Sequence, residues 1–449
     1  MNLDKTYKVI IESFDVNGYG VTHIDDKVIF VLYALEDEEV LIKIINEHKK
    51  YAFAEAVEIL KKSPHRVLSL EEIKELSGEI DLAHIDYETE LKIKENKVKN
   101  TLKLDGYKFN SIIKSDKINH YRNKIMVPFQ SINNGEDYEV ISGFYEKKSH
   151  HIIDSNNDIL SNETANNIIY LIKRYLMLFH VPIYNEETKK GIFKEVMIRN
   201  TINNDYMVVL IVTKKYDFSN LIEILTNEFK EIKSIYININ DNKNNVLLAD
   251  EFILIYGDKT ITENILGLNF EVLPKAFMQV NHDQCEKLYL EALRMAELKK
   301  DMNVIDAYCG IGSITLNIAK SVNHVYGIEI VEDAIISANK NKELNNIYNV
   351  DFILGSCEDE IVKLSNKNNI DLIIFDPPRK GCDKKFIDTV AEMKIKKIVY
   401  ISCNIATAKR DIDILISRGY ELKEVTPVDL FSRCSHVETI TLLVRNDAK

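Results

Sequence analysis

Residues 303–315 read NVIDAYCGIGSIT and join an apolar strand pattern to a glycine-rich turn. Asp306 lies near the end of the apolar run, and Gly310 and Gly312 precede a helical pattern. Glycines at such a turn let the backbone bend sharply and approach a ligand closely. The third glycine of a dinucleotide fingerprint is missing, because Ser313 and the residues after it take its place, and this disfavours NAD. The stretch therefore predicts the first strand–turn–helix unit of an α/β domain that binds a nucleoside cofactor.

Strand patterns alternate with helical patterns from about residue 273 to the C-terminus. The last two strand patterns are joined by residues 430–435, which are too few for a helical crossover, so we expect them to pair antiparallel. Five helix-linked parallel strands that end in a hairpin are typical of a Rossmann-like class I methyltransferase domain. The predicted strands are 303–308, 324–330, 351–355, 371–376, 396–402, 421–429 and 436–444.

Polar residues stand where four of these predicted strands end. Asp306, Glu329, Asp376 and Cys403 hold these positions, and Asp376 is followed by two prolines that stiffen the exit from the strand. Open α/β sheets bind ligands at the carboxyl ends of their strands. Glu329 follows Asp306 by 23 residues and could accept two ribose hydroxyls. Each residue alone could be a turn or cap residue, but together they predict a pocket for S-adenosylmethionine, a nucleoside without a pyrophosphate.

Cys403 lies in KKIVYISCNIATAKRDI, residues 396–412, where an apolar run gives way to a helical pattern. The positive end of that helix should lower the pKa of the thiol below its usual value of about 8.5 and make it a nucleophile. A buried, inert cysteine is the alternative. Cys382 is a rival nucleophile in a loop, and Cys309 and Cys434 also lie near the pocket in the sequence. We interpret these three as structural.

A thiolate beside a methyl sulfonium suggests methylation of uracil at C5. Addition of sulfur to C6 makes C5 nucleophilic, C5 takes the methyl group, and a base then removes the C5 proton so that the thiol can leave. Glu438 is the candidate base, with His436 on the same face of the last strand. Partial desolvation should raise the pKa of Glu438 toward neutrality. The alternative is an ordinary surface glutamate on a terminal strand.

The rest of the chain predicts two further domains. Residues 1–62 contain five short strand patterns separated by turn residues, which suggests a small OB-like β-barrel. Residues 63–272 mix strand patterns with a long helical pattern over 71–103 and indicate a central α+β domain. Residues 273–449 form the predicted catalytic domain.

Composition limits the possible classes of protein. The 449 residues carry a net charge of −12 and contain no apolar run long enough to span a bilayer. No signal peptide is apparent, and the six cysteines follow residue 284 without a CxxC pair, so we expect a cytoplasmic protein without disulfides or a zinc site. Residues 379–410 hold nine lysines or arginines against three acidic residues, which indicates a phosphate-binding surface or a solvated helix face.

Several motifs together resemble one family, the bacterial RNA uracil-C5 methyltransferases, and within it the branch that carries an N-terminal TRAM barrel and acts on 23S ribosomal RNA. The resemblance covers nearly the whole chain, and its last three motifs in this order are highly specific. The motifs are GYGV (18–21), SPHR (63–66), YRNK (121–124), GFYEKKSHHIID (143–154), FMQVN (277–281), DAYCGIGS (306–313), DPPRKG (376–381), SCN (402–404) and HVE (436–438).

The resemblance implies roles for particular residues. The nucleophile falls on Cys403 and the proton-abstracting carboxylate on Glu438. The resemblance further implies 23S ribosomal RNA as the partner, with no DNA or membrane partner, and a monomer. The S-adenosylmethionine contacts fall on Gln279, Tyr308, Glu329 and Asp376.

One departure from the family concerns an iron–sulfur cluster, which many members hold through four cysteines. Here Glu71, Ser77 and Ile80 stand near three of the expected positions and Asp158 near the fourth, and no cysteine precedes Cys285. All-cysteine ligation is therefore impossible, and we expect no metal cluster and ordinary packing in its place.

Three alternatives to this function stay open. A transfer-RNA uracil-C5 methyltransferase would use the same chemistry, although the N-terminal barrel argues against it. An RNA-binding ribosome-assembly factor with a decayed site would not need the intact set of site residues. A cytosine-C5 methyltransferase also forms a cysteine adduct, but it would need an acid partner that the sequence does not identify.

Overall fold

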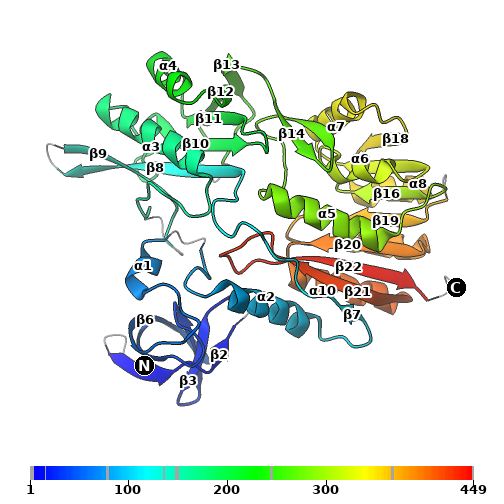
Figure 1. Cartoon of the computed structure of the whole chain (residues 1–449), viewed down its shortest axis with the longest axis horizontal. Helices are drawn as coiled ribbons and strands as arrows, with labels where there is room; N and C mark the ends of the chain where they lie inside the picture. The colour runs from blue at the N-terminus through cyan, green and yellow to red at the C-terminus, as the bar shows by residue number, and fades with distance from the viewer. Residues whose placement is uncertain are drawn as a thin grey trace.

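The computed structural model describes residues 5–15, 17–76, 80–134, 137–146, 151–242, 246–365 and 369–446. The described residues form three large sheets, which are an N-terminal, a central and a C-terminal sheet, and a small two-stranded sheet (Figure 1). In the view of Figure 1, the N-terminal sheet lies below the central sheet, and the C-terminal sheet lies beside both. No helix among the described residues is long and apolar enough to cross a membrane.

The N-terminal sheet has six strands that curl around an apolar core, where five strands were expected. The first predicted strand divides because its two parts pair with different partners. Ile11 N–H donates to Glu38 O, whereas Glu12 N–H donates to Val21 O. The strands are β1 (Thr6–Ile10), β2 (Ser13–Phe14), β3 (Gly20–Ile24), β4 (Lys27–Leu32), β5 (Glu39–Glu47) and β6 (Tyr51–Lys61).

The single helix expected over 71–103 is wrong, because the structure has two helices there, α1 (Leu70–Lys74) and α2 (Tyr87–Leu102). Each has its own N-terminal cap: Ser69 accepts from the Glu72 N–H, and Asp86 accepts from the Thr89 N–H. Before α2, residues 82–85 are buried one after another, which is not the period of an amphipathic helix.

Helix α2 and the short strand β7 (Lys108–Phe109) belong to the core of the C-terminal sheet, although we assigned them to the central domain. Leu91, Val98 and Leu102 of α2 pack in that core, and β7 pairs with the last-but-one strand of the chain. Residues 87–109 therefore pack with the C-terminal sheet. Local sequence patterns do not reveal such a contact between distant segments.

The central sheet has the order β13-β12-β11-β10-β8-β9, and two helices pack on it. A hairpin, β14 and β15, follows it in the chain and packs into the C-terminal core through Ile265, Leu268 and Phe270. The elements are β8 (Lys124–Asn134), β9 (Asp137–Ser142), α3 (Glu163–Leu178), β10 (Phe193–Asn200), β11 (Tyr206–Val212), α4 (Ser219–Glu228), β12 (Ile232–Ile239), β13 (Phe252–Gly257), β14 (Ile261–Ile265) and β15 (Leu268–Val272).

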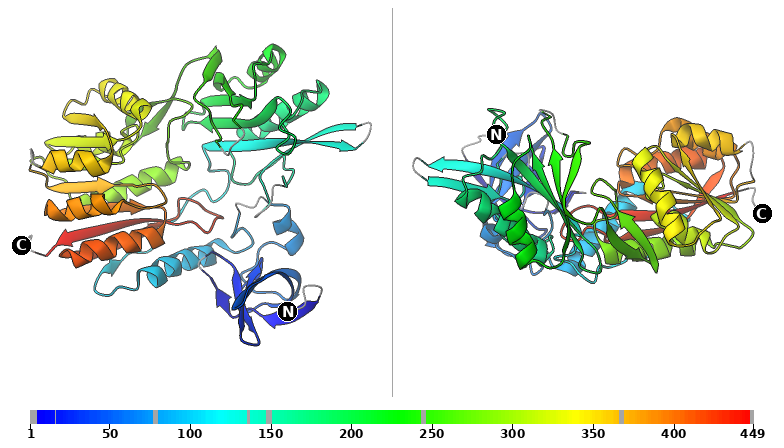
Figure 2. Two further views of the ribbon diagram at one scale, coloured as in Figure 1. Left: turned by 180° about the vertical axis from the view of Figure 1, so that it is seen from behind. Right: turned by 90° about the horizontal axis from the view of Figure 1, so that it is seen from above.

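The C-terminal sheet has the order β18-β17-β16-β19-β20-β22-β21-β7, with helices on both faces (Figure 2). Strands β16 to β20 are parallel, and β22 runs antiparallel between β20 and β21, which confirms the predicted antiparallel hairpin. The strands are β16 (Asn303–Ala307), β17 (His324–Glu329), β18 (Val350–Leu354), β19 (Leu372–Phe375), β20 (Lys397–Ser402), β21 (Tyr420–Val428) and β22 (Glu438–Arg445). The helices are α5 (His282–Ala296), α6 (Ser313–Ala319), α7 (Glu332–Leu344), α8 (Cys357–Ser365), α9 (Lys384–Glu392) and α10 (Ile405–Ser417).

Candidate active site

The carboxyl ends of the parallel strands open into a cavity of about 1120 Å³. Asp306, Glu329, Asp376 and Cys403 all line it, as their positions at the strand ends predicted. Glu438 reaches the same cavity from the start of β22. Gln279 and Tyr308 line it as well, so the seven residues that the sequence analysis selected for the site share one cavity.

The glycine turn after β16 has the left-handed backbone that the sequence suggested. Gly312 has φ +83° and is the N-cap of α6, and a Cβ atom there would lie 2.7 Å from the Phe352 ring. Gly310 has φ +54°, and its N–H donates to Glu329 Oε2 at 3.1 Å. A side chain at residue 312 would therefore push the loop out of the position in which it contacts Glu329.

Glu329 is held at the end of β17 by backbone hydrogen bonds. Its Oε1 accepts from the N–H groups of Ile330 and Val331 at 2.8 and 2.9 Å, and its Oε2 accepts from Gly310. A carboxylate offers about four acceptor positions, so a further one remains on Oε2. The side chain is thus oriented before any ligand binds and keeps the capacity to accept a hydroxyl.

Asp376 and Gln279 meet in the cavity although 97 residues separate them in the chain. Gln279 Nε2 lies 3.3 Å from Asp376 Oδ2, and burial raises the pKa of Asp376 to about 7. Burial also raises the pKa of Asp306 to about 7, and Asp306 accepts a hydrogen bond from the Thr315 hydroxyl. Gln279 is visible in the sequence only through the family motif, because no periodicity or strand end marks it.

Tyr308 extends the cavity wall beyond the glycine turn. It has φ +65°, and its ring packs against Phe386 at a centroid distance of 5.6 Å. Its hydroxyl donates weakly to Glu358 at 3.5 Å. A left-handed non-glycine residue is uncommon and is held here by the packing around it.

The strand register brings Cys403 and Glu438 together. In the antiparallel pair β20–β22, Ser402 lies opposite Thr439. Cys403 directly follows β20 and Glu438 is the first residue of β22, so both lie at the same edge of the sheet and line the cavity. The two groups are near enough that the Glu438 carboxylate raises the pKa of the Cys403 thiol.

The expected low pKa of the Cys403 thiol is wrong. Burial, and then the Glu438 and Asp376 carboxylates, raise this pKa to about 11, while Arg379 acts in the opposite direction. The helix gives little help because Asn404, one residue later, is the N-cap of α10 and accepts from the Ala406 N–H. The thiol lies before the cap, among carboxylates, rather than at the free N–H groups of the helix.

Glu438 is the most isolated acidic group of the cavity. Its side chain is 2 % exposed, and its Oε2 accepts no hydrogen bond from any residue that the structure describes. Burial and then the Asp376 carboxylate raise the pKa of Glu438 well above its usual value, while Arg379 opposes the shift. This confirms the predicted direction of the shift.

His436 lines the cavity but does not share a strand face with Glu438 as we expected, because β22 begins only at Glu438. The Arg379 guanidinium lies 2.7 Å from His436 Nε2 and 3.0 Å from Nδ1. Burial and this positive charge lower the pKa of His436 to about 4. His436 is therefore a neutral hydrogen-bond partner of Arg379, a residue to which the sequence analysis gave no role.

The other cysteines differ from Cys403 in burial. Among the six, only Cys403 is partly exposed. Cys382 is buried outside the cavity lining, with its N–H donating to Asp411, and burial raises the pKa of its thiol. Cys309 and Cys434 line the cavity but are buried. Their structural interpretation stays a prediction.

Apolar side chains pack near the positions at which the family resemblance would place a metal cluster. Ile73, Ile80 and Leu160 pack in one apolar cluster there, as we expected, and Asp158 accepts from the N–H groups of Leu160 and Ser161 at 3.1 and 2.8 Å. Ser77 lies outside the described residues.

Sequence reasoning gave no role to three further lining residues, Asp81, Arg122 and Phe431. Arg122 stands in the YRNK motif, but nothing in the local pattern indicates that it faces the cavity. Asp81 and Phe431 come from loops 350 residues apart in the chain. Only the fold brings them to the same wall.

Comparison with known proteins agrees with this geometry. The sequence model of the tRNA (Uracil-5-)-methyltransferase family matches residues 86–446, and that of the TRAM domain matches residues 3–57. An uncharacterized RNA methyltransferase of Clostridium acetobutylicum is 38% identical over 98% of this chain and 97% of its own. One of Fusobacterium nucleatum is 37% identical over 98% of this chain and 95% of its own.

The fold also matches a solved structure, the Pyrococcus abyssi tRNA (uracil-54, C5)-methyltransferase in complex with S-adenosyl-L-homocysteine. The TM-score is 0.78 with 24% identity, over 97% of this chain and 99% of that one. The cavity fits such a cofactor, because it combines the glycine turn with an oriented Glu329 carboxylate that retains an acceptor position. The chain is an RNA methyltransferase with an N-terminal TRAM domain that uses S-adenosylmethionine, and it belongs to the tRNA (uracil-5-)-methyltransferase family.

Proposed function

We propose that the protein methylates C5 of a uracil in 23S ribosomal RNA through a covalent adduct between Cys403 and C6 of the base. The observation that carries this proposal is that Cys403 and Glu438 line one cavity, from the neighbouring ends of the paired strands β20 and β22. A thiol and a buried carboxylate with a free oxygen, in a cavity that fits S-adenosylmethionine, supply the nucleophile and the base that this reaction needs.

In the first step Cys403 acts as the nucleophile. Its partly exposed thiol gives its proton to water, Sγ forms a bond to C6, and the C5–C6 π electrons move toward C5. When bound, S-adenosylmethionine would supply an electrophilic methyl group to C5, with the methyl–sulfur bond breaking and S-adenosylhomocysteine as the leaving group. Arg379 lowers the pKa of the Cys403 thiol, so its guanidinium favours the thiolate that starts the reaction.

In the second step Glu438 removes the proton from C5. The C–H electron pair restores the C5–C6 double bond, and the C6–S electron pair returns to Sγ, which frees Cys403. Burial makes the Glu438 carboxylate a stronger base than an exposed glutamate, because it raises the pKa. The Arg379 guanidinium opposes this rise in the pKa of Glu438. We assign Gln279, Tyr308, Glu329 and Asp376 to the cofactor in this scheme.

The choice of 23S ribosomal RNA rests on the motif resemblance. Transfer RNA is the second candidate, favoured by the description of the matching family. The N-terminal barrel does not separate the two, because the fold of a solved transfer-RNA enzyme matches 97% of this chain and so includes most of residues 1–62. The RNA class therefore has to be decided by experiment.

Covalent trapping tests the proposal. The protein is incubated with S-adenosylmethionine and 5-fluorouridine-substituted 23S transcripts, and denaturing gels are run. Fluorine at C5 cannot leave as a proton, so the adduct should stall after methyl transfer. We expect a shifted band that needs S-adenosylmethionine and vanishes in Cys403→Ala but not in Cys382→Ala.

Three results would change the proposal. A band with transfer RNA and none with 23S transcripts would move the substrate to the second candidate. A band that persists in Cys403→Ala would exclude this nucleophile. No band with either RNA, despite measurable cofactor binding, would favour an RNA-binding protein with a decayed site.

A further inference from the structure

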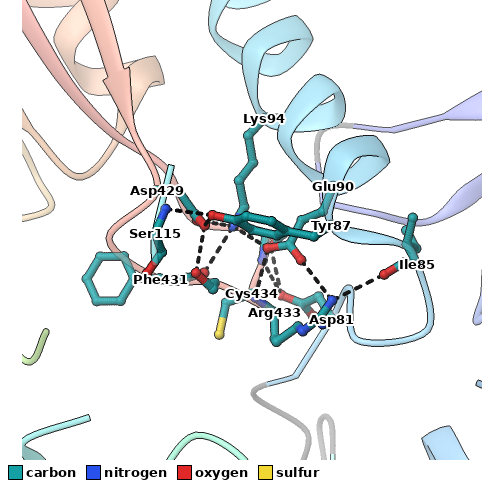
Figure 3. A network of polar contacts seen from close by, with 12 residues as sticks. Asp81, Ile85, Tyr87, Glu90, Lys94, Ser115, Asp429, Phe431, Arg433 and Cys434 are labelled. Atoms are coloured by element: carbon teal, nitrogen blue, oxygen red, sulfur yellow. Dashed lines mark hydrogen bonds and ion pairs between the residues drawn. The ribbon is translucent and has the colours of Figure 1, made fainter. Parts of the chain in front are cut away.

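The segment that leads into Glu438 is held by a buried network of charged groups. The segment, residues 429–437, connects β21 to β22 and is called the base loop below. Figure 3 shows its partners, which come mainly from α2 and the chain just before it. Because Glu438 Oε2 accepts no hydrogen bond among the described residues, the backbone leading to Glu438 has a large part in placing the carboxylate.

Lys94 is the centre of this network. Its side chain is fully buried, and its ammonium donates to Glu90 Oε1 at 2.7 Å, to Asp429 Oδ1 at 2.6 Å and to the Phe431 carbonyl at 3.0 Å. An ammonium has three N–H groups, and each has an acceptor here. Two of the three acceptors belong to the base loop, so α2 is tied directly to it.

Asp429 is the first residue of the base loop, and its second carboxylate oxygen is also held by hydrogen bonds. Asp429 Oδ2 accepts from the Tyr87 hydroxyl at 2.7 Å and from the Ser432 hydroxyl at 2.6 Å. The Tyr87 hydroxyl in turn accepts from the Ser115 N–H at 2.7 Å. Burial alone would raise the pKa of Asp429, but Lys94 and these hydrogen bonds lower it, so the carboxylate is ionised.

Arg433 fixes the middle of the base loop. It has φ +69°, its N–H donates to Glu90 Oε1 at 2.8 Å, and its carbonyl accepts from the N–H groups of Asp81 and Leu82. Asp81 Oδ2 accepts from the N–H and the hydroxyl of Ser435 at 3.0 and 2.8 Å. A left-handed arginine persists only where its surroundings hold it, and here both of its backbone polar groups are bonded outside the loop.

The network therefore ends at Ser435, three residues before Glu438. Lys97 of α2 donates to the Ser435 carbonyl at 2.8 Å, and His436 and Glu438 follow in the cavity lining. Packed apolar residues would stabilise such a junction as well as a buried ion pair does or better. Buried, fully bonded charges instead select one conformation, because any shift leaves a charge unpaired.

We propose that Lys94, with Glu90 and Asp429, positions Glu438 for removal of the C5 proton. The proposal rests on the proposed function, because it assigns a role in the second step. Lys94 is a positioning residue that does not touch the RNA or the cofactor. Loosening the base loop should impair proton removal more than formation of the adduct, since Cys403 is held separately at the end of β20.

The test uses Lys94→Met in the full chain, with Lys92→Met as the matched control. Lys92 lies on the exposed side of the same helix and undergoes the same loss of charge. Both variants and the wild type are given ordinary and 5-fluorouridine-substituted RNA with S-adenosylmethionine. Turnover and denaturant-stable adduct are measured, with cofactor affinity as a check of folding.

Lys94→Met should turn over on the order of tenfold to a hundredfold more slowly and should accumulate methylated adduct on ordinary RNA. Wild type and Lys92→Met should show adduct only with the fluorinated RNA. A mere loss of stability would lower adduct and turnover together, so slow turnover without adduct on ordinary RNA would overturn the proposal, as would wild-type behaviour.

If Lys94→Met fails to bind cofactor, Tyr87→Phe gives the same comparison with one hydrogen bond removed. It should show a severalfold rise in adduct on ordinary RNA, and no rise would overturn the proposal. If the wild type forms no adduct with either RNA, the proposed function fails and the positioning role fails with it. That outcome is distinct, because the defect then appears in the wild type rather than only in the variants.

Discussion

The two halves of the cavity are built in different ways. The cofactor half, around Asp306, Glu329 and Asp376, is made by turns that directly follow parallel strands. The hydrogen bonds that orient Glu329 come from its own turn and from the turn of the neighbouring strand. The base half, around Cys403 and Glu438, depends on an antiparallel strand inserted into the sheet and on a loop held by α2, more than 330 residues away in the chain. Local chemistry therefore places the residues that we assign to the methyl donor, whereas long-range packing places Cys403 and Glu438, which we propose act on the RNA base.

Glu438→Gln tests the base half most directly and should have the largest effect. Glutamine keeps the shape of the side chain but cannot accept the C5 proton, so turnover should fall by about 10² to 10⁴-fold. Methylated adduct should persist on ordinary RNA, which a denaturing gel would reveal. Full turnover in this variant would remove Glu438 from the mechanism and weaken the contrast between the two halves.

The pH dependence of Cys403 alkylation tests the electrostatics of the base half. Burial and the adjacent carboxylates place the pKa of the thiol at about 11, so its rate of reaction with iodoacetamide should still be rising at pH 10. Between pH 8 and pH 10 we expect roughly a hundredfold increase, against about fourfold for an ordinary thiol of pKa about 8.5. Mass spectrometry of the Cys403 peptide would measure it. A plateau near pH 9 would show that the thiol is not surrounded by negative charge.

Glu329→Gln tests the cofactor half. The change removes the negative charge while keeping an oxygen acceptor, and it should weaken cofactor binding by about 1.5 kcal/mol, roughly tenfold. Calorimetric titration with S-adenosylhomocysteine would measure the loss. At saturating cofactor, trapping on fluorinated RNA should approach the wild-type yield. A loss of trapping that saturating cofactor does not restore would show that the two halves do not act separately.

Asp306→Asn tests how the buried Asp306 carboxyl makes the free energy of unfolding depend on pH. It should have the smallest effect of the four changes. Burial raises the folded-state pKa of Asp306 to about 7, above an unfolded value of about 3.9. The stability that this neutral carboxyl contributes is complete below pH 4 and is lost as the pH rises through 7. From pH 6 to pH 7 the free energy of unfolding should fall by about 1 kcal/mol more in the wild type than in the variant. Denaturant titrations followed by circular dichroism would measure the two slopes, and parallel slopes would contradict the shift.

Residues at strand ends could be predicted because they follow a local rule. Asp306, Glu329, Asp376 and Cys403 were selected from strand ends alone, and the structure places all four on one cavity. Gln279 depended on the family motifs, whereas Glu438 was selected as the candidate base from its place on the last predicted strand. The pKa of Cys403 was predicted in the wrong direction, because the sequence shows the helix that follows the thiol but not the carboxylates that face it.

By itself the sequence determined the order of strands and helices, the antiparallel end of the sheet and the residues available for chemistry, because these follow from periodicity, turn residues and loop length. Only the tertiary structure decided that α2 packs against the catalytic sheet and that Lys94 reaches Asp429. Such contacts join segments at opposite ends of the chain, and their energy comes from burial and charge pairing that no local pattern records. The position of Glu438, the proposed base, is therefore a property of the whole fold.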